Sequence, residues 1–382
     1  MPLRIAVLSI LIAAVIAPGS AMALSDDEIE AKLESIKLPS GFSIALYAND
    51  LPKARCLAVG DNGTVFVSTR GDKFVYAIAD TNGDTVADTR HIVYTIGDEG
   101  DGKERKMPNG VAFHNGDLYI ATMTTVFRLD DIESHLSDPP KPVIVTEAYP
   151  NQKTHGWKFI AFGPDDKLYV PVGTPCNICD PEEEIQGTIS RINADGSGHE
   201  IIAHGIRNSL GFDWHPETGE LWFTENGADQ LGDDIPGDEL NVITETGQHF
   251  GNPYVHQGDI LDEEFGKGKN VDDYESPAMT LGPHIAALGM RFYTGGMFPK
   301  DYKNQIFIAE HGSGGRQELI GYRVMLVRVD GSKATSYEDF ATGWIQSNNA
   351  WGRPVDVAIL ADGSMLVSDD RVGAVYRISY DD

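Results

Sequence analysis

The chain has 382 residues, of which 58 are Asp or Glu and only 30 are Lys or Arg, so its formal net charge is −28. A negative field of this size repels nucleic acids and anionic lipids, and it excludes them as partners. It remains compatible with cation binding and with neutral substrates such as sugars. The 41 Gly and 20 Pro residues indicate many turns, which favours short strands over long helices.

The N-terminus reads as a signal peptide over residues 1–23. Arg4 supplies a short positive region, residues 5–17 are apolar, and Ala21, Met22 and Ala23 form a small-residue cleavage site. A buried N-terminal helix is the alternative. The apolar run is too short to cross a bilayer comfortably, and no other stretch is long and apolar enough for a membrane span. We therefore expect a periplasmic or secreted protein whose mature chain, 24–382, folds as one domain.

Two short elements are predicted before the main body of the chain. The segment "DDEIEAKLES" from Asp26 has the pattern of a short helix. The segment "GFSIALYA" from Gly41 has the pattern of a strand, and we expect it to pair with the far end of the chain.

The chain contains six copies of one sequence repeat. Each repeat consists of an apolar strand, a tight turn, a second apolar strand, another turn and a third strand. The turns, such as "DNG" and "ADGS", supply the Gly, Asn or Asp that hairpins need at positive φ. The six units begin at Leu57, Asn109, Lys158, Leu210, Gly289 and Arg353.

Regular repeats of several short strands are typical of a β-propeller with one sheet for each blade. We therefore predict an all-β fold, a six-bladed β-propeller of four-stranded antiparallel blades. A two-sheet sandwich is the alternative, but its sequence would not repeat the same strand–turn–strand pattern so regularly.

Polar residues precede the first strand of several units. In a propeller the loops that enter the inner strands meet around the mouth of the axial channel, so these residues would converge from distant positions. They are Met107–Gly110, His155, Arg207 with Asn208, His284, and Arg353. Arginines gathered in an acidic chain suit a bound anion, because guanidinium groups pair carboxylates in bidentate fashion. The alternative for Arg353 is an ion pair with the nearby Asp356.

Two loops have the composition of calcium sites. The first, Asn226–Asp229, follows the second strand of the fourth unit and offers side-chain and backbone oxygens, which Ca²⁺ prefers. The second, "DTNGDTVAD" from Asp80 to Asp88, alternates oxygen ligands around Gly83 but lacks the closing glutamate of an EF-hand. A solvated turn is the alternative for this second loop.

The cysteines are too few for a disulfide-built scaffold. Cys176 and Cys179 form a C-x-x-C pair, and Cys56 stands alone. Export makes a local disulfide plausible for the pair. A zinc site would need further Cys or His at set spacing, and a redox-active pair is the third alternative.

Seven motifs follow one another along the chain: "MPNGVAF", "THGWKFIAFGPDDKLYVPVG", "GIRNSLGFDW", "TENGADQ…GDELN", "GGMFPKDYKNQIFIAEHGS", "IGYRV" and "GRPVDV". Taken together, they resemble the glucose/sorbosone dehydrogenases, a family of exported six-bladed propellers that use pyrroloquinoline quinone (PQQ) with calcium. The resemblance extends over essentially the whole mature chain and keeps the order of the motifs. It is closer to the sorbosone and pyranose dehydrogenase branch because of "GTPCNICD" and "AEHGS…GYRV".

The resemblance implies a role for each residue of the rim. His155 would be the general base that takes the proton of the substrate hydroxyl, a role suited to a neutral imidazole with a pKa near neutrality. Ca²⁺ would lie on the backbone carbonyls of Gly227 and Ala228. The residues expected to contact PQQ are Arg207, which would also stabilise developing negative charge, together with Asn208, His284, Arg316, Arg323 and Arg353.

The chain departs from the family pattern in two places. Ala228 stands where a proline is often found, which matters little if only its carbonyl is used. After "HGS" the family often has Trp-Asn-Arg, whereas this chain has "GGR". Two glycines therefore replace the Trp and the Asn, and only the arginine, Arg316, is retained.

The expected activity is therefore the oxidation of an aldose or related aldehyde sugar, with an electron acceptor as the second partner. A calcium-dependent lactonase or esterase is the alternative, although such an enzyme has no use for Arg207, Arg316 and Arg353 at one mouth. A non-catalytic binding propeller is a third hypothesis, for which Trp157, Trp344 and Trp351 could provide an aromatic surface.

Overall fold

The computed structural model describes residues 24–96, 107–314 and 316–381. The predicted signal peptide lies outside the described residues. Within them, no helix is long and apolar enough to cross a membrane. The predicted N-terminal helix is confirmed as α1 (Asp26–Leu33), which begins with a capping box between Ser25 and Glu28. Its apolar face, Ile29 and Leu33, is buried against the body of the protein.

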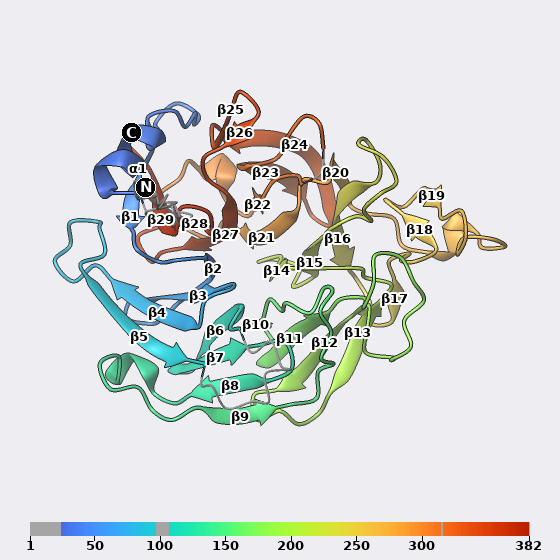
Figure 1. Ribbon diagram of the computed structural model, residues 1–382, viewed down its shortest axis with the longest axis horizontal. Coiled ribbons are helices and arrows are strands. Elements are labelled where there is room, and N and C mark those ends of the chain that lie inside the picture. Colours follow the sequence, from blue (N-terminus) through green and yellow to red (C-terminus); the bar gives the residue numbers. More distant parts are fainter. Residues whose placement is uncertain (1–23, 97–106, 315, 382) are drawn as a thin grey trace, which may run out of the picture.

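Six antiparallel sheets are arranged like blades around a central axis (Figure 1), which confirms the predicted propeller. The first blade consists of β2 (Ala54–Val59), β3 (Val65–Thr69), β4 (Phe74–Ala79) and β5 (Thr89–Thr95). The second consists of β6 (Gly110–His114), β7 (Asp117–Ala121), β8 (Val126–Leu129) and β9 (Val143–Thr146). The third consists of β10 (Ala161–Phe162), β11 (Lys167–Val172), β12 (Thr188–Asn193), β13 (Glu200–His204) and β17 (Gln248–His249).

The remaining blades complete the circle. The fourth consists of β14 (Gly211–Trp214), β15 (Leu221–Glu225), β16 (Gly237–Ile243) and β20 (Met279–Pro283). The fifth consists of β21 (Ala287–Phe292), β22 (Ile306–Glu310), β23 (Arg323–Asp330) and β24 (Lys333–Ala341). The sixth consists of β27 (Pro354–Ile359), β28 (Met365–Asp369), β29 (Ala374–Tyr380) and β1 (Phe42–Ala48). Short elements outside the blades are β18 (Val255–His256), β19 (Ile260–Leu261), β25 (Ile345–Gln346), β26 (Asn349–Ala350) and the 3₁₀ turns Ile132–Ser134, Val271–Asp273 and Lys300–Tyr302.

The N-terminal strand closes the ring, as expected. β1 pairs with β29 in antiparallel fashion, with Phe42 opposite Tyr380, so both ends of the chain are fastened in one blade. One detail of the prediction is wrong, because the third blade has five strands. β17, which belongs to the long insertion between the third and fourth strands of the fourth blade, adds parallel to the outer edge of β13.

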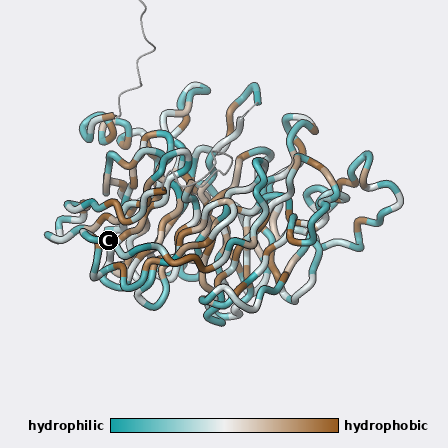
Figure 2. Tube along the Cα trace, turned by 60° about the horizontal axis from the view of Figure 1, so that its bottom comes forward, coloured by the Kyte–Doolittle hydropathy of each residue, from teal (hydrophilic) through white to brown (hydrophobic). Residues whose placement is uncertain are grey.

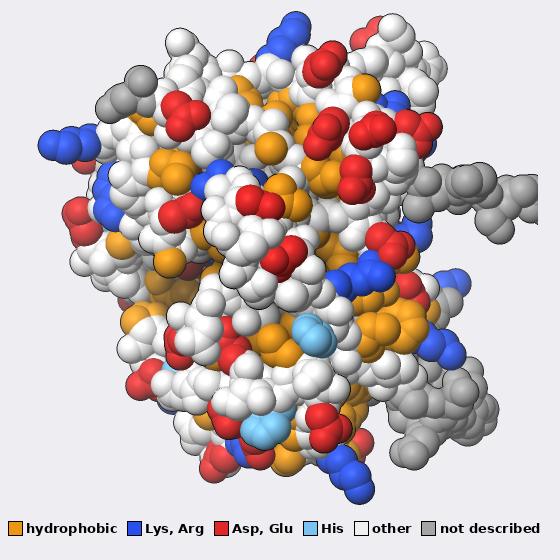
Figure 3. All heavy atoms as spheres, turned by 90° about the vertical axis from the view of Figure 1, so that its left-hand side faces the viewer, with side chains coloured by type: hydrophobic (Ala, Val, Ile, Leu, Met, Phe, Trp, Pro, Cys, Tyr) orange, Lys and Arg blue, Asp and Glu red, His pale blue; other side chains and the backbone are white. Residues whose placement is uncertain are grey.

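The hydrophobic core lies between neighbouring blades. Apolar residues are concentrated along the strands and polar residues in the connecting loops (Figure 2). Phe159 and Phe212, which belong to the third and fourth units, pack edge to face with ring centroids 4.9 Å apart. Each blade therefore buries both of its faces only against its neighbours, which is why no single repeat could fold alone. Acidic side chains are spread over the outer face seen in Figure 3.

Antiparallel pairing also decides which residues share the rim. The start of each inner strand lies beside the end of the second strand of the same blade, for example Ala287 opposite Glu310 and Pro354 opposite Asp369. Residues that precede first strands and residues that follow second strands therefore come together at one mouth of the propeller.

Candidate functional site

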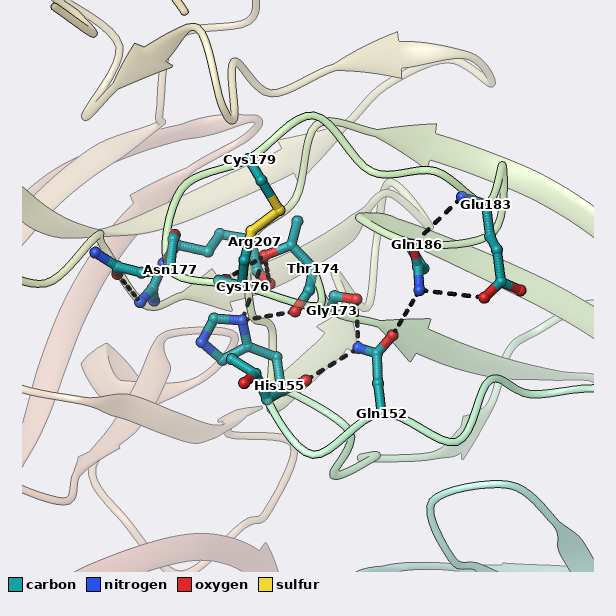
Figure 4. Close-up of a disulfide and its surroundings, with 11 residues drawn as sticks. Gln152, His155, Gly173, Thr174, Cys176, Asn177, Cys179, Glu183, Gln186 and Arg207 are labelled. Atoms are coloured by element: carbon teal, nitrogen blue, oxygen red, sulfur yellow. Dashed lines mark hydrogen bonds between the residues drawn. A yellow bond between two sulfur atoms is a disulfide. The ribbon is translucent and has the colours of Figure 1, made fainter. Parts of the chain in front are cut away.

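His155 is held in a defined orientation just before the third blade. Its Nδ1 lies 3.0 Å from the carbonyl oxygen of Thr174, which can only accept a hydrogen bond (Figure 4). Nδ1 therefore carries the proton, and Nε2 keeps its lone pair. The backbone of His155 has a φ of 48°, a left-handed conformation that is uncommon for a residue with a side chain and concentrates at functional sites.

The environment of His155 keeps the ring neutral. Burial lowers its pKa to about 4, and the positive charge of Arg207 acts in the same direction. This value is below the near-neutral pKa that we expected, because the ring is more deeply buried than its polar sequence neighbours suggested.

Arg207 precedes the fourth blade and is almost entirely buried. Its Nε donates to the carbonyl oxygen of Asn177 at 2.9 Å, and its Nη1 donates to that of Asn226 at 3.0 Å. Its Nη2 donates to Asn177 Oδ1 at 2.7 Å and to Asp229 Oδ2 at 3.0 Å. Four of the five guanidinium N–H groups are thus used, and one N–H of Nη1 is left for a ligand.

Gly173 lies in space between His155 and the backbone of Arg207. A Cβ added at Gly173 would lie 2.5 Å from the Cβ of His155 and 2.8 Å from the carbonyl oxygen of Arg207. Only a glycine permits this approach, so the end of β11 fixes how closely the imidazole and the Arg207 backbone come together.

The loop that follows β15 is held by hydrogen bonds to Asn208 and Asp238. Asn208 Nδ2 donates to Asn226 Oδ1 at 3.1 Å, and Asp238 Oδ1 accepts from the Gly227 N–H at 3.0 Å. Asp238 is buried, which raises its pKa to about 6. Within the described residues, no N–H or O–H donates to the carbonyl oxygens of Gly227 and Ala228. Two backbone oxygens in a fixed loop are suitable ligands for Ca²⁺.

Buried carboxylates surround the base of this loop. Glu225 and Glu239 lie opposite each other on β15 and β16, and both are almost fully buried. Burial raises the pKa of Glu239 to about 7, and burial together with the neighbouring Glu239 raises that of Glu225. Both carboxyl groups are therefore harder to ionise than exposed ones, because their negative charges would be desolvated and close together.

Arg353, before the sixth blade, does not pair with Asp356. Its Nη2 lies 2.8 Å from Nδ1 of His311, and His311 Nε2 lies 2.9 Å from Asp370 Oδ1. Because Arg353 can only donate, His311 accepts at Nδ1 and donates from Nε2 to the carboxylate. Arg55 Nη1 donates to the other oxygen of Asp370 at 2.9 Å. This network joins the first, fifth and sixth blades.

A further cation, Arg70, lies beside this network. Burial lowers its pKa to about 10, and the positive charges of Arg55 and Arg353 act in the same direction. Its guanidinium carbon lies 5.1 Å from the ring centroid of Trp157. Trp157 in turn packs against an apolar cluster formed by Leu210, Leu288 and Val355, which belong to three further blades. Arg70 therefore stands next to an apolar patch to which several blades contribute.

The unsatisfied donors of three arginines fit a ligand with several carboxylates. Nε of Arg55, Nε of Arg353 and Nη1 of Arg316 are buried, and none has a hydrogen-bond partner in the described part of the protein. Unsatisfied buried cationic N–H groups are costly, and carboxylates satisfy them well.

The other residues predicted from the sequence are already engaged by protein groups. His284 Nε2 lies 2.7 Å from the carbonyl oxygen of Gly232 and so ties down the loop of the fourth blade. Arg316 Nη2 donates to Asp234 Oδ1 at 3.3 Å and links the fifth blade to this loop. Arg323 pairs with Glu310 and Asp339 at 2.7 and 2.8 Å, so that its charge is neutralised within the fifth blade. Arg323 therefore differs from Arg353 in having both of its ion-pair partners in its own blade.

The sequence did not predict three residues of the cluster around Arg353, namely Arg55, Arg70 and His311. Arg70 follows β3 and His311 follows β22, so both occupy the position after a second strand, which antiparallel pairing brings to the same rim. The Asn226–Asp229 loop, which follows β15, stands at the same place in its unit, so this position is the sequence signal that identifies Arg70 and His311.

Two sequence features with open alternatives also have defined structures. Cys176 and Cys179 are joined in a disulfide, while Cys56 is buried and free. In the Asp80–Asp88 loop, the Asp80 carboxylate accepts from the N–H groups of Gly83 and Thr85, at 2.7 and 2.8 Å. The loop is therefore stabilised by its own backbone, as a plain turn would be.

Comparison with known proteins finds relatives in both sequence and structure. A curated relative, an uncharacterized protein of Borreliella burgdorferi, is 32% identical over 386 residues, which cover 95% of this chain and 94% of the relative. Among solved structures, the calcium structure of a Trichoderma reesei carbohydrate-active enzyme of family AA12 superposes with a TM-score of 0.76 at 17% identity, covering 91% and 97% of the two chains. The holo form of the pyranose dehydrogenase PQQ domain from Coprinopsis cinerea gives 0.74 at 18% identity, covering 90% and 97%.

These structures share the fold of the chain. The sequence itself matches the glucose/sorbosone dehydrogenase family over residues 112–377, which include His155, Arg207, the Asn226–Asp229 loop and Arg353. The chain belongs to the glucose/sorbosone dehydrogenase family of oxidoreductases.

Proposed function

We propose that the protein is a PQQ- and calcium-dependent dehydrogenase that oxidises an aldose or related aldehyde sugar. The observation that carries the proposal is the position of a neutral, oriented His155 beside Arg207, on the same rim as the arginines around Arg353. The structural relatives, one a calcium structure and one a holo PQQ domain, support the same cofactors.

The residues that would hold the cofactor follow from their charge, their position at the rim and, for three arginines, their unsatisfied N–H groups. Arg353, Arg55 and Arg70 would pair the carboxylates of PQQ, and Arg316 would add a fourth cation through its unsatisfied Nη1. Asn208 would contact the quinone edge, and His284 would act by holding the loop of the fourth blade. The carbonyl oxygens of Gly227 and Ala228 would hold Ca²⁺.

The chain's own groups would divide the chemistry between them. When bound, PQQ supplies the acceptor for the hydride that leaves the substrate carbon. His155 would accept the hydroxyl proton at Nε2, whose lone pair is kept available because Nδ1–H donates to Thr174. Arg207 would stabilise the negative charge that develops beside it through its remaining Nη1 N–H. Because burial lowers the pKa of His155 to about 4, the base is unprotonated at neutral pH.

The cellular setting is part of the proposal. The leader-like sequence at residues 1–23 and the disulfide support export to the periplasm or the medium. The second partner would be an electron acceptor that reoxidises the reduced cofactor.

Reconstitution with measurement of turnover tests the function. Purified mature protein is incubated with PQQ and Ca²⁺, and reduction of a dye is followed with a panel of aldoses. Dye reduction that needs sugar, PQQ and Ca²⁺ together is the expected result. Hydrolysis of lactones that needs Ca²⁺ but not PQQ, with no dye reduction by any sugar, would replace the proposal by the lactonase alternative.

A further inference from the structure

The side chain of Asn177 links the two parts of the candidate site. Its Oδ1 accepts from Arg207 Nη2 at 2.7 Å and from the Asp229 N–H at 2.9 Å. Its Nδ2 donates to the carbonyl oxygen of Asp229 at 2.9 Å, and its own carbonyl accepts from Arg207 Nε. One amide thus fastens the Arg207 guanidinium to the loop that holds Gly227 and Ala228.

The disulfide limits the freedom of Asn177. Cys176 and Cys179 flank Asn177 and Ile178, so the disulfide closes a ring of four residues around them (Figure 4). The connection from β11 to β12 contains no strand or helix of its own. Without the cross-link, Asn177 would lie in an irregular segment, and holding it against Arg207 would cost more conformational entropy.

The same segment also reaches His155. Thr174 Oγ1 donates to the carbonyl oxygen of Cys176 at 3.1 Å, and the carbonyl oxygen of Thr174 accepts from His155 Nδ1. The N–H of Thr174 donates to the carbonyl oxygen of Arg207 at 2.9 Å. Residues 173–179 therefore touch both residues to which the proposed function assigns the chemistry.

We propose that Asn177 is a positioning residue, held by the Cys176–Cys179 disulfide, which orients Arg207 and fixes it to the 226–229 loop. The inference rests on the proposed function only for its catalytic consequence. Its structural part, the link from Asn177 to Arg207 and Asp229, stands on the contacts alone. In this view the C-x-x-C pair is a structural clamp of the active site.

Three variants and one matched control test the proposal in the full mature chain. Asn177→Ala removes the side-chain bonds, Asn177→Asp keeps the oxygen acceptors but loses the Nδ2 donor, and Cys176→Ser with Cys179→Ser removes the clamp. Ile178→Ala lies in the same ring and is the control. The readouts are kcat and KM of the reconstituted enzyme, the Ca²⁺ affinity of the protein without PQQ, and hydrogen exchange of peptides that cover residues 226–232.

The expected pattern distinguishes a selective effect on Arg207 and the 226–229 loop from a non-specific loss of folded structure. Asn177→Ala should lower kcat about tenfold with little change in KM, because a hydrogen bond to a charged group that acts in the transition state is lost. Exchange at the Asp229 amide should rise by a similar factor. Asn177→Asp should recover most of kcat, the double serine variant should lie between wild type and Asn177→Ala, and Ile178→Ala should match wild type.

Equal kcat and equal exchange in Asn177→Ala and Ile178→Ala would overturn the proposal. A wild-type protein that shows no PQQ-dependent turnover would instead count against the proposed function. In that case the hydrogen exchange of the 226–232 peptides and the Ca²⁺ affinity would still decide whether Asn177 holds this loop.

Discussion

His155 and Arg207 are joined through a single residue, Thr174. Its carbonyl oxygen accepts from the imidazole of His155, and its N–H donates to the carbonyl oxygen of Arg207. The candidate base and the candidate electrostatic stabiliser lie 52 positions apart in the sequence. Both are nevertheless held by the backbone of the same residue, one by its C=O and the other by its N–H. A change in this segment should affect both.

Removal of the His155 base should abolish most of the activity. In His155→Asn the side-chain amide can still donate to Thr174, but it cannot accept a proton. We expect kcat to fall by about 10²–10⁴, the usual contribution of a general base, while PQQ affinity stays within a few-fold of wild type. Steady-state kinetics and a PQQ titration check this, and a variant with near-normal kcat would remove His155 from the mechanism.

The pH profile should reflect the lowered pKa of His155. The base works in its neutral form, which is lost only as the pH falls through about 4. The acid limb of kcat/KM should therefore lie near pH 4, well below the pKa of about 6.5 for a free histidine. Measurement of kcat/KM from pH 3.5 to 8 tests this, and an acid limb near pH 6.5 would show that the ring is not desolvated in this way.

Gly173 should tolerate no side chain. Gly173→Ala places a Cβ against both His155 and the Arg207 backbone, so it should lower kcat at least tenfold by moving the pair apart. Gly296→Ala is the matched control, because no atom lies within 4 Å of its added Cβ and its φ is not in the positive region. If the two variants have the same kcat, the close approach at Gly173 has no part in catalysis.

Lys158 should make the protein less stable at acidic and neutral pH. It is fully buried, donates to the Gly156 carbonyl oxygen at 3.2 Å and lies 5.1 Å from the Tyr149 ring centroid. Burial lowers its pKa to about 7, below the unfolded value of 10.5. The unfolded chain then binds more protons between these values, so stability should rise with pH across this window.

A methionine at position 158 should remove this cost. Lys158→Met should be more stable than wild type by up to about 5 kcal/mol at pH 6, since one pKa unit corresponds to about 1.4 kcal/mol, and the difference should shrink as the pH rises toward 10. Thermal melts of this variant beside Lys153→Met, an exposed residue of the same loop, provide the check. A Lys158→Met protein that is less stable than wild type at every pH would mean that the ammonium is well compensated.

Two arginines of the chain should respond differently to substitution. Arg353→Gln removes a cation with an unsatisfied buried N–H, so PQQ affinity should fall about tenfold or more. Arg323→Gln breaks ion pairs with Glu310 and Asp339 and should lower the melting temperature while leaving PQQ affinity nearly unchanged. If PQQ affinity instead fell in Arg323→Gln and not in Arg353→Gln, the carboxylates of PQQ would bind near Arg323 and the proposed site would be wrong.

The sequence allowed the fold to be predicted because each blade repeats its own local signal. The hairpin turns and apolar strands recur in every unit, and even the ring-closing strand near Gly41 could be anticipated. The fifth strand of the third blade could not, because β17 comes from an insertion in the next unit and has only two residues. Such a short strand forms where it can dock on an existing edge, which no local pattern reveals.

The site was predictable where a residue lies within a few positions before an inner strand. His155, Arg207 and Arg353 were found in this way. The Asp370–His311–Arg353 chain was not, because it depends on how the end of a second strand in the fifth blade lies beside the sixth blade. Nor could the sequence distinguish Arg323 from Arg353, since the decisive difference is the buried Glu310 opposite Arg323 on β22.

The central claim is that this rim binds PQQ together with calcium. Isothermal calorimetry of the mature protein with PQQ, with Ca²⁺ present and after its removal by a chelator, tests it most directly. We predict saturable binding of one PQQ per chain that weakens strongly without Ca²⁺ and returns when Ca²⁺ is restored. No PQQ binding at any Ca²⁺ concentration, in a protein that melts cooperatively, would contradict the claim.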